Sequence, residues 1–235
     1  MTTPEISIVI PLHNEVENVS PLQRELRAAL EGWSYEVILV DDGSTDGTAA
    51  AVEPAPELRL LEFKKNAGQS AAMLAGMLAA RGEVIVLLDG DLQNDPQDIP
   101  ALLAEIKKGA DLVCGYRVRR MDSVVKKLTS RIANFIRSRF VADGVRDTGC
   151  TLKAMRKECV TALVPFNGLH RFIPALIKNA GFRIVEIPVH HRARQFGASK
   201  YGLGNRAVRA TLDMLGVRWL QARHLNYEIR RDETS

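Results

Sequence analysis

Short apolar runs alternate with segments of helical periodicity over about the first 115 residues of the chain. The runs are rich in β-branched residues and have the length of buried strands; they lie at 6–10, 37–40, 58–62, 84–88 and 112–115. Between them, apolar residues recur every three or four positions over about 20–31, 69–81 and 97–108. Ser20 and Pro21 are expected to begin the first of these helices, as N-cap and first helical residue. Strands that alternate with helices in this way predict an α/β domain with a mostly parallel sheet flanked by helices.

Polar residues follow the apolar runs at the points where the strands end. His13 and Glu15 come after the first run, and Asp41 and Asp42 come after the second. Because the carboxyl ends of parallel strands share one edge of an open α/β sheet, ligands bind at that edge. A carboxylate in the second turn can accept hydrogen bonds from a nucleobase or a ribose, although a turn held by its own hydrogen bonds is the simpler alternative.

The strongest candidate for chemistry is the stretch Asp89-Gly90-Asp91, which ends the fourth apolar run. Residues two apart in extended chain point to the same side, so the two carboxylates are expected to converge on one point. A divalent cation would relieve their repulsion, and Gln93 adds a neutral oxygen ligand. An acidic turn without a ligand is the structural alternative. Neither Gly-x-Gly-x-x-Gly nor Gly-x-x-x-x-Gly-Lys-Ser/Thr occurs, so a phosphate ligand would need a metal and basic side chains.

The second half of the chain is more basic than the first. Residues 117–140 contain eight Lys and Arg residues and one acid, Asp122, and apolar residues recur among them at helical spacing over about 124–140. A second such region begins at Asn205 and includes Trp219 and Tyr227. Basic amphipathic helices are typical of segments that lie on an anionic membrane surface, and a helix packed on the domain with a solvated basic face is the alternative.

Length and composition exclude several other classes. The 235 residues suffice for one substantial core, and 46% hydrophobic with 26% charged residues are ordinary for a folded protein. The three cysteines form no Cys-x-x-Cys pair, which favours a reducing compartment over a disulfide scaffold or a zinc site. The sequence contains no signal-peptide pattern and no apolar run of about 18 residues. We therefore expect no transmembrane segment and a cytoplasmic location, peripheral to the cytoplasmic face of the membrane.

Several motifs carry a family resemblance when they are taken in order. They are Pro11-x-x-Asn14-Glu15, Val40-Asp41-Asp42-Gly43-Ser44-x-Asp46-Gly47-Thr48, Asn66-x-Gly68, Asp89-Gly90-Asp91-Leu92-Gln93-x-Asp95-Pro96, Gly115-x-Arg117, Asp147-Thr148-Gly149 and Arg194-x-x-Gly197-x-Ser199-Lys200-Tyr201. Together they resemble the inverting family 2 glycosyltransferases of the GT-A fold. More narrowly, they are similar to the polyprenyl-phosphate hexose synthases, of which dolichol-phosphate mannose synthase is an example. The resemblance extends from Ile8 to about Leu215.

This resemblance implies a role for each matching residue. The nucleoside pocket would be lined by Pro11, His13, Glu15, Asp41 and Asp42. Mg²⁺ or Mn²⁺ on the donor's diphosphate would be held by Asp89, Asp91 and Gln93. The lipid phosphate and the donor's diphosphate would be gathered by Arg117, Arg131, Arg194, Ser199 and Lys200. Lys64, at a helix entrance near this site, is a further candidate for the donor's phosphates, with a solvated lysine as the alternative.

The expected reaction is transfer of a hexosyl group from GDP-mannose or a UDP-sugar to a polyprenyl monophosphate of the dolichyl or undecaprenyl type, with inversion. An acceptor phosphate has a second pKa near ~6, so it is largely a dianion at neutral pH and needs no strong base. Asp91 and Arg117 are the expected catalytic residues, and Asp147 is the nearest additional carboxylate if a base is needed. Residues 1–165 are expected to form the catalytic core, and 166–235 a C-terminal part with the acceptor-phosphate loop and an amphipathic helical region.

Other functions compete with this one. A family 2 enzyme that glycosylates a sugar hydroxyl would give the cluster of cations no phosphate to bind. A nucleotidyltransferase would share the metal but leave the basic helices without a purpose. A non-catalytic module that binds membranes or nucleic acid would use the basic helices, but the acidic turns argue against nucleic acid as a partner. Family members often continue into transmembrane helices, so either the two basic helices suffice for membrane attachment or a separate membrane-anchoring subunit is needed.

Overall fold

The computed structural model describes residues 3–118, 141, 144–194, 204–223 and 225, with the backbone alone for 204–210. The expected helix at 124–140 therefore lies outside the described residues, as do three residues expected to bind the acceptor phosphate: Arg131, Ser199 and Lys200.

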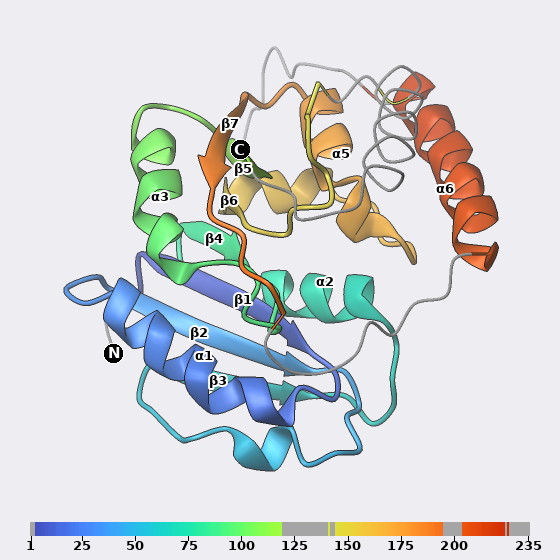
Figure 1. Cartoon of the computed structure of the whole chain (residues 1–235). Helices are drawn as coiled ribbons and strands as arrows, with labels where there is room; N and C mark the ends of the chain where they lie inside the picture. Colours follow the sequence, from blue (N-terminus) through green and yellow to red (C-terminus); the bar gives the residue numbers. More distant parts are fainter. Residues whose placement is uncertain (1–2, 119–140, 142–143, 195–203, 224, 226–235) are drawn as a thin grey trace, which may run out of the picture.

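A seven-stranded sheet forms the centre of the molecule (Figure 1). Its strands, in the order in which they lie side by side, are β3 (Leu58–Glu62), β2 (Tyr35–Asp41), β1 (Ile6–Leu12), β4 (Val84–Leu87), β6 (Lys153–Arg156), β5 (Leu112–Arg117) and β7 (Ile184–Val189). The first four pair in parallel, β6 runs antiparallel between β4 and β5, and β7 pairs in parallel with β5. The predicted mostly parallel sheet is confirmed. Because β7 comes from the expected C-terminal part yet completes this sheet, the two parts share one sheet, and the boundary at 165 stays a prediction.

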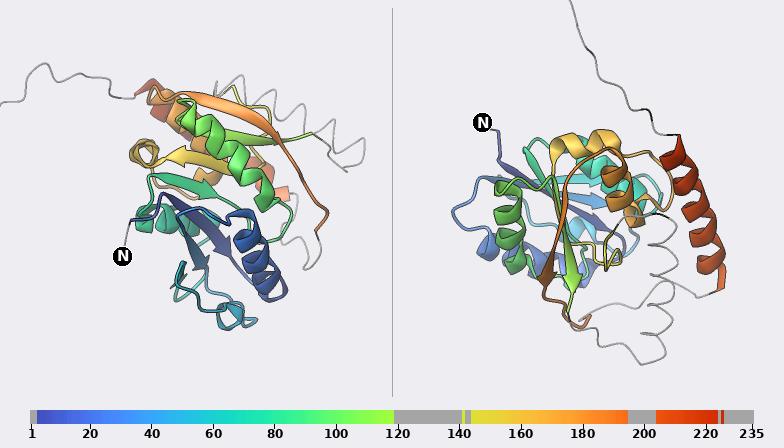
Figure 2. Two further views of the ribbon diagram at one scale, coloured as in Figure 1. Left: turned by 90° about the vertical axis from the view of Figure 1, so that its left-hand side faces the viewer. Right: turned by 90° about the horizontal axis from the view of Figure 1, so that it is seen from above.

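Helices cover both faces of the sheet (Figures 1 and 2). One face is packed by α1 (Val16–Ala29) and α3 (Ile99–Lys107), and the other by α2 (Gln69–Ala79), α5 (Ile173–Asn179) and α6 (Gly204–Ala222). Short 3-10 helices lie at η1 (Ala49–Ala51), η2 (Pro96–Asp98), η3 (Lys157–Ala162) and η4 (Leu169–Arg171). Among the described helices, none is both long enough and apolar enough to cross a bilayer.

The first helix begins earlier than its sequence predicts. Helix α1 starts at Val16, so Pro21 lies inside the helix and the expected start at Ser20 is wrong. The backbone N–H of Val16 donates to Asp46 Oδ2 (3.2 Å), and that of Glu15 donates to Thr48 Oγ1 (2.8 Å). Side chains about thirty residues away thus satisfy donors that a helix start leaves unpaired, which no local pattern reveals.

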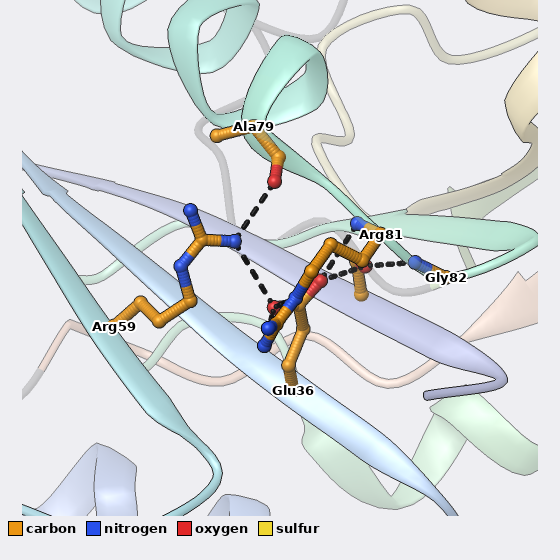
Figure 3. A network of polar contacts seen from close by, with 6 residues as sticks. Glu36, Arg59, Ala79, Arg81 and Gly82 are labelled. Atoms are coloured by element: carbon orange, nitrogen blue, oxygen red, sulfur yellow. Dashed lines mark hydrogen bonds and ion pairs between the residues drawn. The ribbon is translucent and has the colours of Figure 1, made fainter. Parts of the chain in front are cut away.

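A buried acid, Glu36, lies at the amino edge of the sheet. The Glu36 side chain is 2% exposed and is surrounded by Ser7, Arg59, Arg81 and the backbone of residues 79–82 (Figure 3). The carboxylate accepts hydrogen bonds from Ser7 Oγ (2.7 Å), Arg81 N (2.7 Å), Arg81 Nε (2.9 Å) and Arg59 Nη1 (3.2 Å). Burial opposes ionisation, but these donors outweigh it and lower the pKa of Glu36 to about 2.

Candidate active site

Two hollows open where the parallel strands end. The first, which we call the inner cavity, has a volume of about 280 Å³ and lies on the face of the sheet covered by α2 and α5. It is lined by Gln69, Met73, Leu87, Asp89, Arg117, Asp147, Thr148, Gly149, Thr151, Lys153, His170, Arg171 and Ile173. The second, the outer groove, has a volume of about 760 Å³. It is lined by Asp41, Gly43, Ser44, Thr45, Gly47, Thr48, Ala49, Ala50, Glu62, Phe63, Lys64, Lys65 and Asn66.

Asp89 belongs to the inner cavity. Its carboxylate accepts hydrogen bonds from Gln69 Nε2 (2.9 Å) and Thr151 Oγ1 (2.6 Å), both neutral donors. Desolvation and the neighbouring charge of Asp91 raise the pKa of Asp89 to about 6. The two carboxylates therefore lie close enough for the charge of Asp91 to act on Asp89, and their convergence on one point stays a prediction.

The carboxylate of Asp91 points to a different set of partners. It accepts a hydrogen bond from Arg194 Nη2 at Oδ2 (2.7 Å) and one from the backbone N–H of Gln93 at Oδ1 (3.2 Å). Strand β4 ends at Leu87, so Gly90 and Asp91 form a turn rather than extended chain. The reason given for convergence, residues two apart in a strand, is thus wrong even though the carboxylates are neighbours.

Packing inside the protein requires a glycine at position 90. A Cβ at this position would lie 2.4 Å from Leu12 Cδ2 and 3.3 Å from the Pro11 carbonyl oxygen. The turn is therefore pressed against the end of β1, which leaves no room for a side chain. The glycine therefore makes room for the neighbouring strand.

Arg117 and Asp147 form a bidentate pair in the inner cavity. Arg117 Nε and Nη2 donate to Asp147 Oδ2 and Oδ1 at 2.7 and 2.8 Å, and the Arg117 backbone N–H adds a third contact at 3.3 Å. Their side chains are 15% and 10% exposed. A Cβ on Gly149 would lie 2.9 Å from Arg117 Nη2, so the glycine makes room for the guanidinium. Both residues were predicted for the site, whereas their pairing was not.

Arg194 reaches Asp91 from the segment that follows β7. This segment is held against residues 89–93, which we call the acidic turn. The contacts are a bridge between Asn94 and His191 and a hydrogen bond from Arg192 N to the Gln93 carbonyl (2.8 Å). Gln93 Nε2 lies 3.4 Å from the Arg192 carbonyl, which leaves the amide oxygen as the atom of Gln93 that can face a cation.

The inner cavity also contains side chains that the motifs did not single out. Lys153, the first residue of β6, is 2% exposed and donates a hydrogen bond to the Cys150 carbonyl. Arg171 ends η4, and His170 Nδ1 lies 2.8 Å from Ser70 Oγ. The local signal for Lys153 is a charged residue inside the otherwise apolar stretch 152–155.

The outer groove holds part of the predicted nucleoside pocket. Asp41 lies at the end of β2, and its carboxylate accepts hydrogen bonds from the hydroxyl and the backbone N–H of Ser44. Lys64 is exposed on the opposite wall, after β3. Gly43 has a φ of +63° and would bring a Cβ within 2.5 Å of the backbone of Lys65 and Asn66, so the two loops touch here.

Asp42 lies next to this groove but does not line either hollow. Its carboxylate accepts hydrogen bonds from Ala67 N (2.6 Å), Gly68 N (2.9 Å) and Asn66 Nδ2 (3.0 Å). These contacts hold the loop that leads into α2. They favour a structural role for Asp42, and its assignment to the nucleoside pocket stays a prediction.

The remaining predicted pocket residues surround the loop after β1. Pro11 lies within β1, and the ring of His13 contacts the Asp42 carbonyl through Nδ1 (2.9 Å). Glu15 Oε2 accepts from Asn18 Nδ2 (2.6 Å). None of the three is in the lining of the inner cavity or the outer groove, so their nucleoside-binding role stays a prediction.

The acidic turn has suitable donors for a hard divalent cation. Asp89 and Asp91 supply carboxylate oxygens and Gln93 an amide oxygen, which are the ligand types that Mg²⁺ and Mn²⁺ prefer. No group of three or more His, Cys, Asp or Glu in the described residues has the arrangement of a metal site. A cation here would therefore need oxygens from a bound ligand or water to complete its shell.

Residues 7–163 match the family model described as "Glycosyl transferase family 2". Among solved structures, that of glucosyl-3-phosphoglycerate synthase from Mycobacterium tuberculosis with Mn²⁺, uridine diphosphate and phosphoglyceric acid is similar, with a TM-score of 0.71. The two proteins are 19% identical, and the match covers 92% of this chain and 78% of the other. This likeness confirms the expected GT-A fold.

Curated relatives are more similar in sequence. Dodecaprenyl-phosphate galacturonate synthase from Rhizobium johnstonii is 40% identical over 224 residues, which cover 91% of this chain and 66% of that protein. Undecaprenyl-phosphate 4-deoxy-4-formamido-L-arabinose transferase from Yersinia enterocolitica is 40% identical over 206 residues, or 85% of this chain and 63% of that protein. The chain thus spans slightly less than two thirds of the length of these relatives. With the family model matching most of the chain and two relatives at this level of identity, the protein belongs to glycosyl transferase family 2.

Proposed function

We propose that the protein transfers a sugar from a nucleotide diphosphate sugar to a polyprenyl monophosphate, with inversion at the anomeric carbon. The observation that carries this proposal is that one cavity contains both Asp89, expected at the donor's metal, and Arg117, expected at the acceptor phosphate. Both relatives are named for joining a sugar to a prenyl phosphate of dodecaprenyl or undecaprenyl type. Because the two relatives are named for different sugars, they support a polyprenyl phosphate as the acceptor more strongly than they support any one sugar donor.

The donor's diphosphate is proposed to bind at the acidic turn through Mg²⁺ or Mn²⁺. Asp89, Asp91 and Gln93 would hold the cation, which supplies positive charge to the departing nucleoside diphosphate. Similar solved structures contain Mn²⁺ or Mg²⁺ together with uridine diphosphate. The nucleoside would extend toward the outer groove, where Asp41 can accept hydrogen bonds from uracil or guanine alike.

The acceptor phosphate is proposed to bind beside Arg117 and Arg194. Asp147 fixes the Arg117 guanidinium through two hydrogen bonds, so the positive charge is preorganised. One phosphate oxygen then forms a bond to the anomeric carbon as the bond from that carbon to the diphosphate oxygen breaks. The nucleoside diphosphate leaves with the electron pair. No proton needs to be removed from the acceptor, which suits a site where Asp147 is engaged with an arginine.

We also propose that α6 lies at an anionic membrane surface. It buries Met214 and Val217 against the domain, whereas Leu212, Leu215 and Trp219 are 62%, 51% and 58% exposed. These three residues recur at helical spacing along one side of α6, and Arg223 stacks on the ring of Trp219 at 5.1 Å. An exposed apolar stripe with flanking arginines is typical of helices in a lipid headgroup layer. Replacing Leu215 and Trp219 by Glu should prevent sedimentation with anionic liposomes; unchanged sedimentation would show that α6 is no anchor.

The transfer proposal is tested with purified protein and undecaprenyl phosphate in detergent micelles. A panel of GDP- and UDP-sugars with Mg²⁺ or Mn²⁺ should yield a charged glycolipid, whose anomeric configuration is read by NMR. Undecaprenol serves as the matched acceptor without a phosphate, and a glycolipid hydroxyl serves as the competing acceptor. Transfer to a hydroxyl but not to the phosphate would replace this proposal with a hydroxyl-directed glycosyltransferase.

A further inference from the structure

The inner cavity contains more positive charge than the proposed reaction uses. Arg117 is paired with Asp147, and Asp89 is proposed to bind the cation on the donor's diphosphate. Two further cations, Lys153 and Arg171, line the same cavity. Neither is part of the motifs that identify the family.

Lys153 is a buried ammonium with few partners. It is 2% exposed, and its hydrogen bond to a described residue goes to the Cys150 carbonyl, although an ammonium has three donors. Its charge acts through space on the carboxylate of Asp89 and partly offsets the rise in the pKa of that acid, but no ion pair within 4.0 Å joins Lys153 to a described carboxylate. Burying a charge is costly unless the charge is paired, so this position favours an anionic ligand.

Arg171 carries a second unmet donor. Its Nε is buried and has no hydrogen-bond partner among the described residues. Its Nη2 lies 3.9 Å from Asp213 Oδ2, which is beyond hydrogen-bond distance. A ligand oxygen at this wall would satisfy a donor that otherwise costs stability.

The shape and the remaining lining of the cavity suit a sugar rather than a diphosphate. Asp91 and Gln93 do not line it, so the cavity meets the proposed diphosphate site at Asp89 and extends away from it. Its volume of about 280 Å³ is at the small end of ligand pockets, which run from roughly 300 to 1,000 Å³. Gln69, Thr151 and His170 offer polar atoms for ring hydroxyls.

We propose that this cavity holds the transferred sugar and that Lys153 and Arg171 bind a carboxylate on it, so that the donor is a nucleotide-linked uronic acid. This inference rests on the proposed function and names its donor class. A neutral hexose would offer the ammonium and the buried guanidinium Nε a hydroxymethyl group, which is uncharged and a weaker hydrogen-bond acceptor than a carboxylate. The other anion that could reach these cations is the acceptor phosphate, and the experiment separates the two.

The test uses pairs of donors that differ only at C6. UDP-galacturonate is compared with UDP-galactose and UDP-glucuronate with UDP-glucose, and GDP-mannuronate is compared with GDP-mannose. With undecaprenyl phosphate as acceptor, we expect kcat/KM to favour the preferred uronate over its neutral partner by about 10- to 100-fold, the range of a charge-assisted hydrogen bond. Calorimetric binding of the same donors without acceptor should show a similar ratio of Kd values.

Lys153→Met removes the charge and keeps most of the length of the side chain, and Arg171→Gln removes the charge at a partly exposed position with a shorter polar side chain. Each should lower the ratio of uronate to neutral-sugar binding by about tenfold or more. Lys157→Met, the same substitution at an exposed lysine four positions along, should leave the ratio unchanged.

The possible outcomes are distinct. Product from neutral donors with no uronate preference would overturn this inference and leave the proposed function standing. No product with any donor would overturn the proposed function itself. An increase in the KM for undecaprenyl phosphate that is equal for all donors would assign Lys153 and Arg171 to the acceptor phosphate instead. If Lys153→Met fails to fold, the donor ratio of Arg171→Gln and the calorimetry of the unmodified protein still decide the question.

Discussion

Glu36 at the amino edge and Asp89 at the carboxyl edge are acids set into the same sheet in opposite ways. Glu36 is surrounded by hydrogen-bond donors, two of which are arginine side chains, and its pKa falls to about 2 (Figure 3). Asp89 receives hydrogen bonds from two neutral side chains and faces a second carboxylate, and its pKa rises to about 6. The ionised form of Glu36 is stabilised by its partners in the protein, whereas the ionised form of Asp89 is destabilised and would be stabilised by added positive charge.

This difference separates an acid with a structural role, Glu36, from one that is proposed to bind a metal, Asp89. Burial alone does not distinguish them, since Glu36 is the more buried of the two. What differs is the kind of hydrogen-bond partner: arginines of the chain donate directly to Glu36, whereas the side chains that donate to Asp89 are neutral and Lys153 acts on it only through space. Four substitutions or conditions test this contrast.

The largest effect is expected at the carboxyl edge. Asp91→Asn keeps the shape of the side chain but removes the charge proposed to bind the metal, and should lower metal-dependent transfer by about 100- to 1,000-fold. The free energy of unfolding should change by less than about 0.5 kcal/mol, because the side chain of Asp91 lies outside the apolar core and its ion pair with Arg194 is partly exposed. Transfer assays and urea denaturation measure the two quantities. Glu57→Gln, which removes a carboxylate from an exposed ion pair with Arg27, is the matched control. Normal turnover in Asp91→Asn would remove the assigned metal site.

Glu36→Gln should show the opposite pattern. The amide cannot accept from two arginines as a carboxylate does, so the free energy of unfolding should fall by about 2 kcal/mol. Transfer kinetics at temperatures where the variant is folded should stay within about twofold of the unmodified protein, since the network lies at the far edge of the sheet. A loss of transfer without a loss of stability would mean that the two edges are coupled.

The dependence of stability on pH provides a finer test of the same acid. Glu36 has an ordinary pKa of 4.5 and a folded-state pKa of about 2, so its contribution is fully present above about pH 4.5. As pH falls from 4.5 toward 2, the carboxylate takes up a proton and this contribution is lost. The difference in unfolding free energy between the unmodified protein and Glu36→Gln should therefore be constant above pH 5 and shrink below 4.5. A difference that stays constant down to pH 2 would contradict the lowered pKa.

The smallest effect is expected at Arg194. Its ion pair with Asp91 competes with a cation for the same carboxylate, so Arg194→Gln should tighten Mn²⁺ binding in the absence of donor by about three- to fivefold. Transfer should nevertheless decline, because Arg194 is proposed to bind phosphate. Isothermal titration with Mn²⁺ measures the affinity, with Arg183→Gln as a control away from the acidic turn. Weaker Mn²⁺ binding in Arg194→Gln would show that Arg194 supports the metal site instead of competing for it.

The strands could be predicted from sequence because each is a local run of buried residues. The run at 58–62 corresponds to β3 residue for residue, and the run at 112–115 lies within β5. The positions of Asp89 and Arg117 in one cavity followed from the family motifs. These signals are either local in the chain or carried by a motif, and both can be read without coordinates.

What could not be predicted depends on contacts between distant segments. The start of α1 depends on Asp46 and Thr48, and the pairing of Arg117 with Asp147 joins positions thirty residues apart. The convergence of Lys153 and Arg171 on Asp89 requires β6 to lie beside β4 and η4 to lie near α2. No spacing rule within one segment contains that information.

The reversed direction of β6 has a consequence for how such enzymes could diversify. Because β6 runs against β4, its first residue, Lys153, lies next to Leu87, the last residue of β4. The acidic turn and the cavity floor are therefore neighbours in space but belong to separate stretches of chain. Under the proposed function, exchanging the short segment around the start of β6 would change which sugar is accepted and leave the proposed nucleotide-binding residues unchanged.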